Sequence, residues 1–178
     1  MNYAGAGFIL LSSDLSTTLL VHDTRSKKWG FPKGHRETTD NSDLETAVRE
    51  CYEETGLTSE DYTVHPEVFK VSKGSHSYNF RYAILRDEER KKNIIPGDTN
   101  EVAELQWVPL KQLLHATNIL DSNKYLRAWI ADIQSNASKK SIHIFKSLLR
   151  TYLQSSHANS IHISSMLGIT ANSVTTSA

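Results

Sequence analysis

One stretch of the chain, residues 34–57, decides the fold, and it reads Gly34-His-Arg-Glu-Thr-Thr-Asp-Asn-Ser-Asp-Leu-Glu-Thr-Ala-Val-Arg49-Glu50-Cys-Tyr-Glu53-Glu54-Thr-Gly56-Leu57. From Ser42 onward its apolar residues follow helical spacing, at i, i+3, i+4, i+7 and i+11: Leu44, Ala47, Val48, Cys51 and Thr55. Ser42 and Glu45 are placed as a capping box, and Gly56 is placed as the stop. The pattern predicts a helix that begins at Ser42, ends before Gly56 and carries one apolar stripe.

The same helix carries three glutamates, Glu50, Glu53 and Glu54, at i, i+3 and i+4. This spacing puts the three carboxylates on one face, opposite the apolar stripe. Each like-charged i, i+4 pair costs roughly a few tenths of a kcal/mol on an exposed helix, and only Arg49 lies within the cluster to offset it. A divalent cation would reverse the sign of that interaction. Oxygen-only ligands favour Mg²⁺ or Mn²⁺ over Zn²⁺, while the alternative is an ordinary solvated helix face.

Residues 34–57 resemble the Nudix box, G-x5-E-x7-R-E-U-x-E-E-x-G-U, where U is a bulky aliphatic residue. The positions that match directly are Gly34, Arg49, Glu50, Glu53, Glu54, Gly56 and Leu57. The match departs from the pattern in two ways. The stretch between Gly34 and Arg49 is one residue longer, so the first glutamate slot falls on Asp40 or Asn41, and Cys51 stands where a larger aliphatic residue is usual.

The resemblance implies an α+β fold, an α/β/α sandwich with a mixed β-sheet, that hydrolyses a nucleoside diphosphate linked to another moiety. Phosphoryl transfer needs charge neutralisation and an aligned water, which carboxylate-held metal ions supply. Glu53 and Glu54 would be the principal metal ligands and catalytic residues, with Glu50 as a further ligand or support. The Gly34 carbonyl would be an additional ligand, because a glycine lets the backbone come close.

Arg49 would orient the glutamates in such an enzyme, or it is a simple ion pair of the helix. In the family the first glutamate of the box holds this arginine in place. Asp40 is the nearest substitute here, and Glu37 is a weaker candidate.

Two segments outside the box narrow the choice of enzyme. Residues 29–35, Trp-Gly-Phe-Pro-Lys-Gly-His, resemble the W-x-x-P-K-G-H entry of asymmetric dinucleoside tetraphosphate hydrolases, where Lys33 would place a cation beside the polyphosphate. Its other reading is a solvated loop lysine. Residues 100–107, Asn-Glu-Val-Ala-Glu-Leu-Gln-Trp, look like the N-E-x-x-x-I/L-x-W segment of the tetraphosphatases and the mRNA-decapping enzymes. This likeness makes Glu101 a metal ligand or general base, with Glu104 as the competing candidate.

The preferred substrate is diadenosine tetraphosphate, cleaved to ATP and AMP. The runner-up is decapping or pyrophosphate removal at an RNA 5′ end, since the W-G-F-P-K-G run also resembles the decapping enzymes. Those enzymes carry a basic helix after the fold. Residues 139–150 would be the corresponding helix here, and the alternative is that they form a solvated amphipathic helix. A third reading is a Nudix fold that only binds RNA or protein, which the retained glutamates disfavour.

Base recognition is less clear from the sequence. Tyr78, Phe80 and Tyr82 alternate along an expected strand, so they share one face. Aromatic side chains at this spacing are more often core, and only Tyr78, close to the turn at Gly74, is assigned to the substrate. His35 and His76 are candidate phosphate contacts. The histidines lack metal-ligand spacing in the glycine loop, and none is assigned to a metal.

The rest of the chain supplies the sandwich. Strands are expected over 6–11 and 17–21 as a hairpin, then over 62–71, 75–86 and 102–108, with loops over 25–34 and 87–100. Helices are expected over 110–115, 125–133 and 142–153. Residues 154–178 contain no Lys, Arg, Asp or Glu and are expected to form a weakly ordered tail after a single domain spanning 1–153.

Composition limits the remaining classes of protein. The 178 residues carry 20 Lys+Arg against 20 Asp+Glu, a balance that argues against a general nucleic-acid or membrane binder. The apolar start has no basic flank and reads as a first strand, and no run reaches the roughly 18 apolar residues of a membrane span. A single thiol, Cys51, cannot form an internal disulfide, which favours a reducing compartment, the cytoplasm, with the nucleus as a second location. The oligomeric state does not follow from the sequence.

Overall fold

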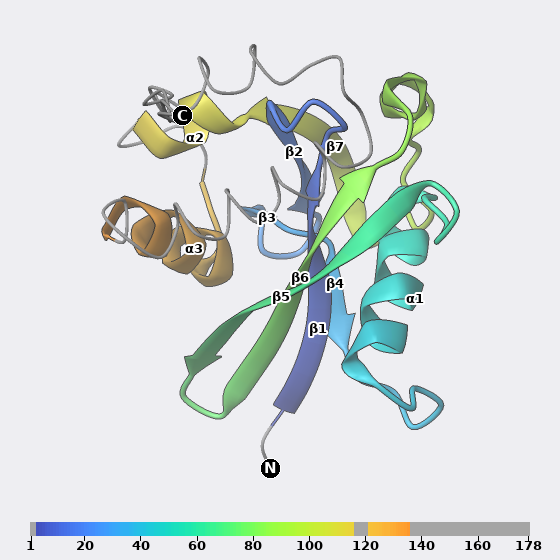
Figure 1. Cartoon of the computed structure of the whole chain (residues 1–178). Helices are drawn as coiled ribbons and strands as arrows, with labels where there is room; N and C mark the ends of the chain where they lie inside the picture. Colours follow the sequence, from blue (N-terminus) through green and yellow to red (C-terminus); the bar gives the residue numbers. More distant parts are fainter. Residues whose placement is uncertain (1–2, 116–120, 136–178) are drawn as a thin grey trace, which may run out of the picture.

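The computed structural model describes residues 3–115 and 121–135. Its centre is one mixed sheet of seven strands (Figure 1). The strands are β1 (Tyr3–Leu11), β2 (Thr17–Asp23), β3 (Trp29–Gly30), β4 (Lys33–His35), β5 (Tyr62–Lys73), β6 (His76–Leu85) and β7 (Val102–Pro109). The main path runs β3-β2-β1-β6-β5, while β4 pairs with β1 and β7 pairs with β2. Only β1 and β6 run parallel, and the expected hairpin of β1 and β2 is present.

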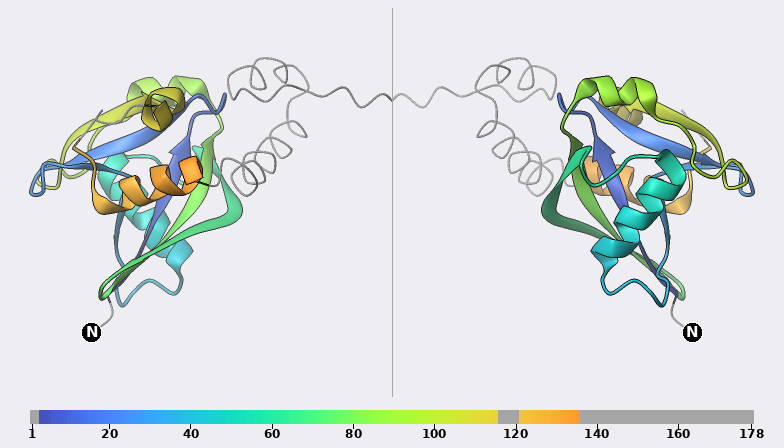
Figure 2. Two further views of the ribbon diagram at one scale, coloured as in Figure 1. Left: turned by 90° about the vertical axis from the view of Figure 1, so that its left-hand side faces the viewer. Right: turned by 90° about the vertical axis from the view of Figure 1, so that its right-hand side faces the viewer.

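Helices cover both faces of this sheet. The helical elements are α1 (Asp43–Thr55), the 3₁₀ helix η1 (Glu88–Asn93), α2 (Leu110–His115) and α3 (Lys124–Ser135). Viewed from one side α3 is in front of the sheet, and from the other side α1 is in front (Figure 2). Along β1 the side chains alternate: Phe8 and Leu10 join the core under α1, whereas Ile9 and Leu11 join the core under α3. This arrangement confirms the expected α/β/α sandwich with a mixed sheet.

Local chemistry sets both ends of α1. The Ser42 hydroxyl oxygen accepts the Glu45 backbone N–H at 3.2 Å, as expected for an N-cap. The Glu45 carboxylate, however, accepts the Asn41 N–H at 2.8 Å instead of returning to Ser42, so the capping box is displaced by one residue. At the other end Gly56 adopts φ 71° and donates its N–H to the Tyr52 carbonyl at 2.8 Å.

The apolar stripe of α1 is narrower than its sequence suggests. Ala47, Cys51 and Thr55 are buried as predicted, but Leu44 is 37% exposed. Thr46 is fully buried instead, and its hydroxyl donates to Asp40 at 3.0 Å. The assignment of Leu44 to the core is therefore wrong: the helix begins after its cap Ser42, as predicted, but near its start it buries Thr46 and not Leu44.

Two stretches expected as loops contain short regular elements. The segment 25–34 includes β3 and the start of β4, and the segment 87–100 includes η1, whose cap is the Asp87 side chain accepting the Glu89 N–H at 2.9 Å. The Trp29 ring stacks on His22 of β2 with centroids 4.8 Å apart, which helps hold β3 in the sheet. Contacts with distant parts of the chain therefore give regular structure to segments whose glycines and prolines, taken alone, indicate a loop.

Some expectations fall outside the described residues. These are the helix over 142–153, the basic residues from Lys139 to Arg150 and the tail over 154–178. None of the helices in 3–115 and 121–135 combines the length and apolarity needed to cross a bilayer.

Candidate functional site

A pocket of about 360 Å³ opens between α1, β4 and the turns that flank β2 and β7. It brings together the residues that the sequence assigns to catalysis, metal and substrate: Lys33, Gly34, His35, Arg49, Glu50, Glu53, Glu54, Tyr78 and Glu101. His76, the other candidate phosphate contact, is not part of the pocket wall. Asp23, Arg25 and Glu37 complete its wall. Residues from five separate segments of the chain therefore meet in one place, although their individual roles stay predictions.

Arg49 forms hydrogen bonds to three carboxylates on the acidic side of this pocket. Its Nη1 donates to Glu50 Oε1 and to Glu53 Oε2, each at 2.9 Å. Its Nη2 donates to Asp40 Oδ2 and to the His35 carbonyl, again at 2.9 Å. One guanidinium thus links two carboxylates of α1 to the loop that precedes the helix.

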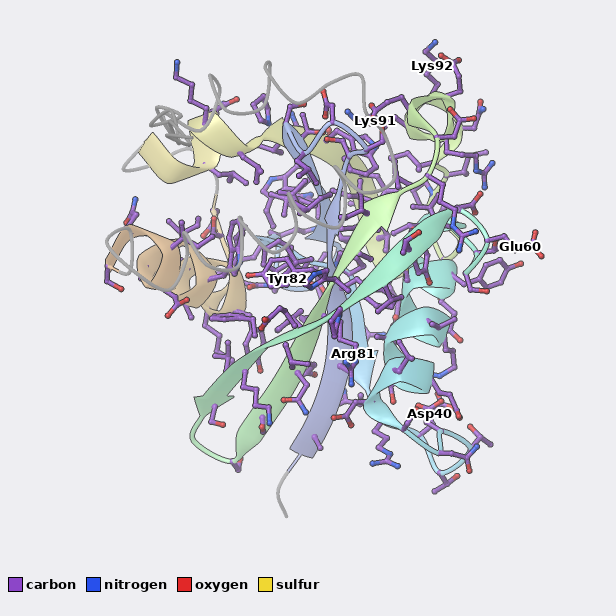
Figure 3. All side chains as sticks on the ribbon, in the orientation of Figure 1. Asp40, Glu60, Arg81, Tyr82, Lys91 and Lys92 are labelled. Carbon is purple, nitrogen blue, oxygen red and sulfur yellow. The ribbon has the colours of Figure 1, made fainter. Side chains whose placement is uncertain are left out.

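Asp40 is the anchor of that guanidinium. It is 9% exposed and lies in the loop before α1 (Figure 3). The Arg49 guanidinium, together with the Glu37 N–H and the Thr46 hydroxyl, holds the pKa of the Asp40 carboxyl well below its usual range, against the opposing effect of burial. Glu37 stands farther off, 3.7 Å from Arg49. The predicted ranking, in which Asp40 is the stronger partner and Glu37 the weaker, is confirmed.

The three glutamates of α1 do not share an open face. Glu53 has a side chain 49% exposed, whereas the Glu50 side chain is only 12% exposed and Glu54 is also partly buried. This corrects the expectation that the carboxylates lie on a solvent-facing side opposite the apolar stripe. The reason is that β4 packs against α1, so the edge of the helix that carries Glu50 and Glu54 faces the sheet.

Burial makes Glu54 a weak acid. Burial raises its pKa to about 8; the nearby Lys33 opposes this rise, while Glu50 and Glu101 add to it. The backbone N–H of Lys33 donates to Glu54 Oε2 at 2.8 Å. Burial also raises the pKa of Glu50, although Arg49 opposes this. The metal-free pocket therefore holds Glu54 mostly protonated near neutral pH.

The pocket fits a divalent cation in the kind of donors it offers. Its acidic lining supplies carboxylate oxygens without sulfur, which are the donors that Mg²⁺ prefers. At Gly34 an added Cβ would lie 2.0 Å from the Glu50 carboxylate, so only glycine lets β4 approach that closely. As the side chains stand, no three acidic, histidine or cysteine groups among the described residues converge on one point, because Arg49 takes oxygens of Glu50 and Glu53. An ion would have to draw those oxygens away from Arg49.

The structure separates the two candidates near β7. Glu101, in the turn before the strand, lines the pocket and lies 3.5 Å from the Arg25 guanidinium. Glu104 lies within β7, paired with His22, and is absent from the pocket wall. The geometry therefore favours Glu101, as the alignment to Trp107 did.

The remaining assigned residues face the pocket from β4 and β6. The Lys33 ammonium lies 5.9 Å from the centre of the Tyr78 ring, and the His35 ring lies 5.9 Å from the same centre. Tyr78 is buried, with its ring 4.6 Å from that of Tyr125. Phe80 and Tyr82 continue the same face into the core, where Tyr82 accepts the Trp129 indole N–H at 3.0 Å.

Sequence reasoning missed Asp23 and Arg25, which also line the pocket. No motif marks them; their only signal is a position in the turn that leads into the Trp29 segment. Gly5 was also missed, and a Cβ there would lie 2.4 Å from the Tyr78 ring. Its signal is a glycine within a strand, a position that often marks a close approach.

Comparisons with known proteins show the family and the fold of the chain. A family model described as the NUDIX domain matches residues 1–130. The m7GpppN-mRNA hydrolase of Saccharomyces cerevisiae (strain ATCC 204508 / S288c) is 27% identical over 107 residues, which cover 60% of this chain and 11% of that protein. The mRNA decapping complex subunit 2 of Schizosaccharomyces pombe is 25% identical over 180 residues, covering 79% of this chain and 22% of the relative. The chain thus matches only a small part of these relatives' length.

Solved structures share the fold. A Caenorhabditis elegans Ap4A hydrolase binary complex superposes with a TM-score of 0.53 at 20% identity, covering 75% of this chain and 98% of that one. A Mycobacterium smegmatis Nudix hydrolase, RenU, superposes with a TM-score of 0.57 at 22% identity, covering 77% and 86% respectively.

Proposed function

The chain belongs to the Nudix family, and on this premise we propose that it is a divalent-metal-dependent pyrophosphohydrolase that cleaves a phosphoanhydride bond of a dinucleoside polyphosphate. The observation that carries the proposal is the single pocket in which Glu50, Glu53, Glu54 and Glu101 face Lys33. A phosphate chain is polyanionic, so a wall of carboxylates suits it only when cations lie between the two. A purely binding role would not need four glutamates there.

The residues that would hold Mg²⁺ or Mn²⁺ are Glu50, Glu53 and Glu54, with Glu101 and the Gly34 carbonyl as further ligands. Such ions supply charge neutralisation at the phosphate oxygens and orientation of a water. Glu54, with its pKa raised to about 8, would release its proton as it becomes a ligand, so ion binding is expected to strengthen as pH rises toward 8.

The other residues of the pocket bind and orient the substrate. Lys33 places its ammonium beside the phosphate chain, and His35, at the exposed mouth, is a second phosphate contact. Glu101 is exposed and is the proposed acceptor of a proton from the attacking water, if it is not itself a ligand. Arg49 is a positioning residue, because it contacts Glu50 and Glu53 and fixes them relative to Asp40.

Diadenosine tetraphosphate, split into ATP and AMP, is the preferred substrate, on the likeness of residues 29–35 to the tetraphosphate hydrolases. Tyr78, which lines the pocket, is the proposed surface for a nucleobase. A second candidate substrate is capped RNA, favoured by the names of the yeast relatives, which are an m7GpppN-mRNA hydrolase and a decapping subunit. A cytoplasmic or nuclear location is part of the same proposal.

The test is to incubate the purified protein in Mg²⁺ with diadenosine tetraphosphate, capped RNA and nucleoside triphosphates, separately, and to resolve the products by chromatography. We expect ATP and AMP from the first substrate. Turnover of capped RNA alone would replace the preferred substrate with the second, and turnover of none would reject the proposal.

A matched pair of variants tests the site itself. Glu101→Gln is expected to lower kcat by roughly 10²-fold or more, the usual contribution of a general base, while Glu104→Gln leaves it within about twofold of the wild-type value. If the two variants changed kcat equally, the assignment of Glu101 to the site would be wrong.

A further inference from the structure

A second pocket, of about 350 Å³, adjoins the candidate site. Asp23 and Lys33 line both pockets, so the two hollows share part of their wall. The rest of its polar wall comes from Ser26 and Lys28 of the β2–β3 turn and from Asn123, Lys124 and Arg127 at the start of α3. Nothing in the Nudix box accounts for this pocket, since none of its other lining residues belongs to that motif.

The pocket is strongly basic. Four cationic side chains, those of Lys28, Lys33, Lys124 and Arg127, stand against one carboxylate, that of Asp23. The Asp23 carboxylate is occupied by its own turn, since Oδ1 accepts the Arg25 N–H at 3.0 Å and the Ser26 N–H at 2.5 Å. Among the described residues, no acidic side chain forms an ion pair with any of the four cations.

The wall of this pocket is held in place by backbone contacts. The Trp29 N–H donates to the Asp121 carbonyl at 2.9 Å, and the Asn123 N–H donates to the Trp29 carbonyl at 2.8 Å. A Cβ on Gly30 would lie 1.9 Å from the Asn123 amide nitrogen, so glycine is what allows the two segments to touch. The start of α3 is therefore attached directly to the segment that leads into Lys33.

The same asparagine orients α3. Asn123 Oδ1 accepts the N–H groups of Tyr125 at 3.0 Å and Leu126 at 2.9 Å, which makes it the cap of the helix. The first turn of α3 consequently presents Lys124 and Arg127 to the pocket, and the positive end of the helix dipole adds to their charge. Lys28 and Lys124 are both only partly exposed and both line the hollow.

We propose that this basic pocket, formed by Lys28, Lys124 and Arg127 next to Lys33, binds a phosphate group that the substrate carries beyond the anhydride being cleaved. The inference rests on the proposed function, because the acidic pocket is taken as the place where the anhydride lies. Lys33 then contacts the phosphate chain where it passes from one pocket into the other. The phosphate comes from one of two sources: the far end of a dinucleoside polyphosphate, or the first phosphodiester of an RNA.

The test uses the double variant Lys28→Ala/Lys124→Ala and a charge-matched control, Lys70→Ala/Lys111→Ala, whose lysines are exposed on β5 and α2. Binding of three fluorescent probes is measured in Mg²⁺, with methylene groups in place of the bridging anhydride oxygens, so that the metal ligands can be filled and no turnover occurs: diadenosine tetraphosphate, the cap dinucleotide m7GpppG and a capped decanucleotide. Wild-type affinity must also fall with salt, and the dependence of log K on log salt should become shallower by roughly 0.7 for each phosphate contact removed.

The double variant is expected to weaken binding at least tenfold for the probe whose phosphate uses the pocket, with the control within twofold of wild type. A loss for diadenosine tetraphosphate assigns the pocket to a polyphosphate, whereas a loss confined to the decanucleotide assigns it to a phosphodiester. Equal affinities of double variant and control for all three probes would overturn the proposal.

Folding is checked with the variant Lys28→Arg/Lys124→Arg, which keeps the charges and should restore binding even if the alanine variant is unstable. Failure of this charge-keeping variant to bind better than the alanine variant counts against the pocket. Because these measurements do not involve hydrolysis, an inactive protein that still shows the expected losses would reject the proposed function and leave the basic pocket standing.

Discussion

Replacing Glu54 by glutamine is expected to stabilise the metal-free protein at alkaline pH. Burial, with help from Glu50 and Glu101, raises the pKa of Glu54 from 4.5 to about 8. A carboxyl whose pKa is higher in the folded state binds its proton more tightly there than in the unfolded chain. The wild-type protein therefore loses stability as pH rises from about 4.5 to about 8, and the glutamine variant does not.

The size of this effect follows from the same pKa. The gap between 4.5 and about 8 corresponds to at most about 5 kcal/mol, at roughly 1.4 kcal/mol for each pH unit. Glu54 is only partly buried, so solvent screening reduces that limit, and we expect a difference of about 1 to 3 kcal/mol between variant and wild type at pH 9. At pH 5 the difference should be near zero.

The assay is urea unfolding in EDTA, followed by tryptophan fluorescence at several pH values from 5 to 9. Glu104→Gln, an exposed carboxylate outside the pocket, is the control and should keep the wild-type pH dependence. If the wild-type and Glu54→Gln proteins show parallel pH profiles across this range, Glu54 does not lie in the environment described here.

Two further substitutions test the frame of the site. Asp40→Asn should lower the free energy of unfolding by about 1 to 3 kcal/mol at pH 7, because Arg49 loses a charged partner. This loss should shrink in acid. Because the pKa of Asp40 is low in the folded protein, its stabilising effect is present above about pH 4 and fades as the pH falls through that depressed pKa. A variant as stable as wild type at pH 7 would contradict this. Gly34→Ala should weaken Mn²⁺ binding at least tenfold in calorimetry, since its Cβ would displace the Glu50 carboxylate, and the variant should still fold. An unchanged affinity for Mn²⁺ would show that Gly34 does not lie at the ion site.

Some parts of the molecule can be read from the chain alone because their causes are local. The ends of α1 depend on Ser42 and Gly56, whose contacts reach only three or four residues along the chain. The alternation of Tyr78, Phe80 and Tyr82 follows from the two-residue period of a strand, and the structure puts all three in one cluster. The helical spacing of the glutamates likewise brings them near one another without reference to any other element.

Other parts depended on segments far apart in the sequence. The short strand β4 lies against α1, and this contact, which no local pattern encodes, buries Glu50 and Glu54 and turns an expected open acidic face into a pocket. Leu44 shows the converse, since this apolar residue fits the helical spacing of the stripe and is nevertheless 37% exposed. Asp23 and Arg25 line the pocket only because the β2–β3 turn lies beside it.

The residues from Trp29 to Leu57 therefore determined which family the chain resembles, where its central helix begins and ends, and which acidic groups come together, because each of these follows from spacing along one short segment. The tertiary structure alone decided how deeply those acids are buried, that Asp23 and Arg25 line the same pocket, and that a basic hollow adjoins it at the start of α3. The physical reason is that burial and charge neighbourhood depend on which distant strands and turns pack together, and pairing such as that of β1 with β6 or of β2 with β7 leaves no mark within either strand.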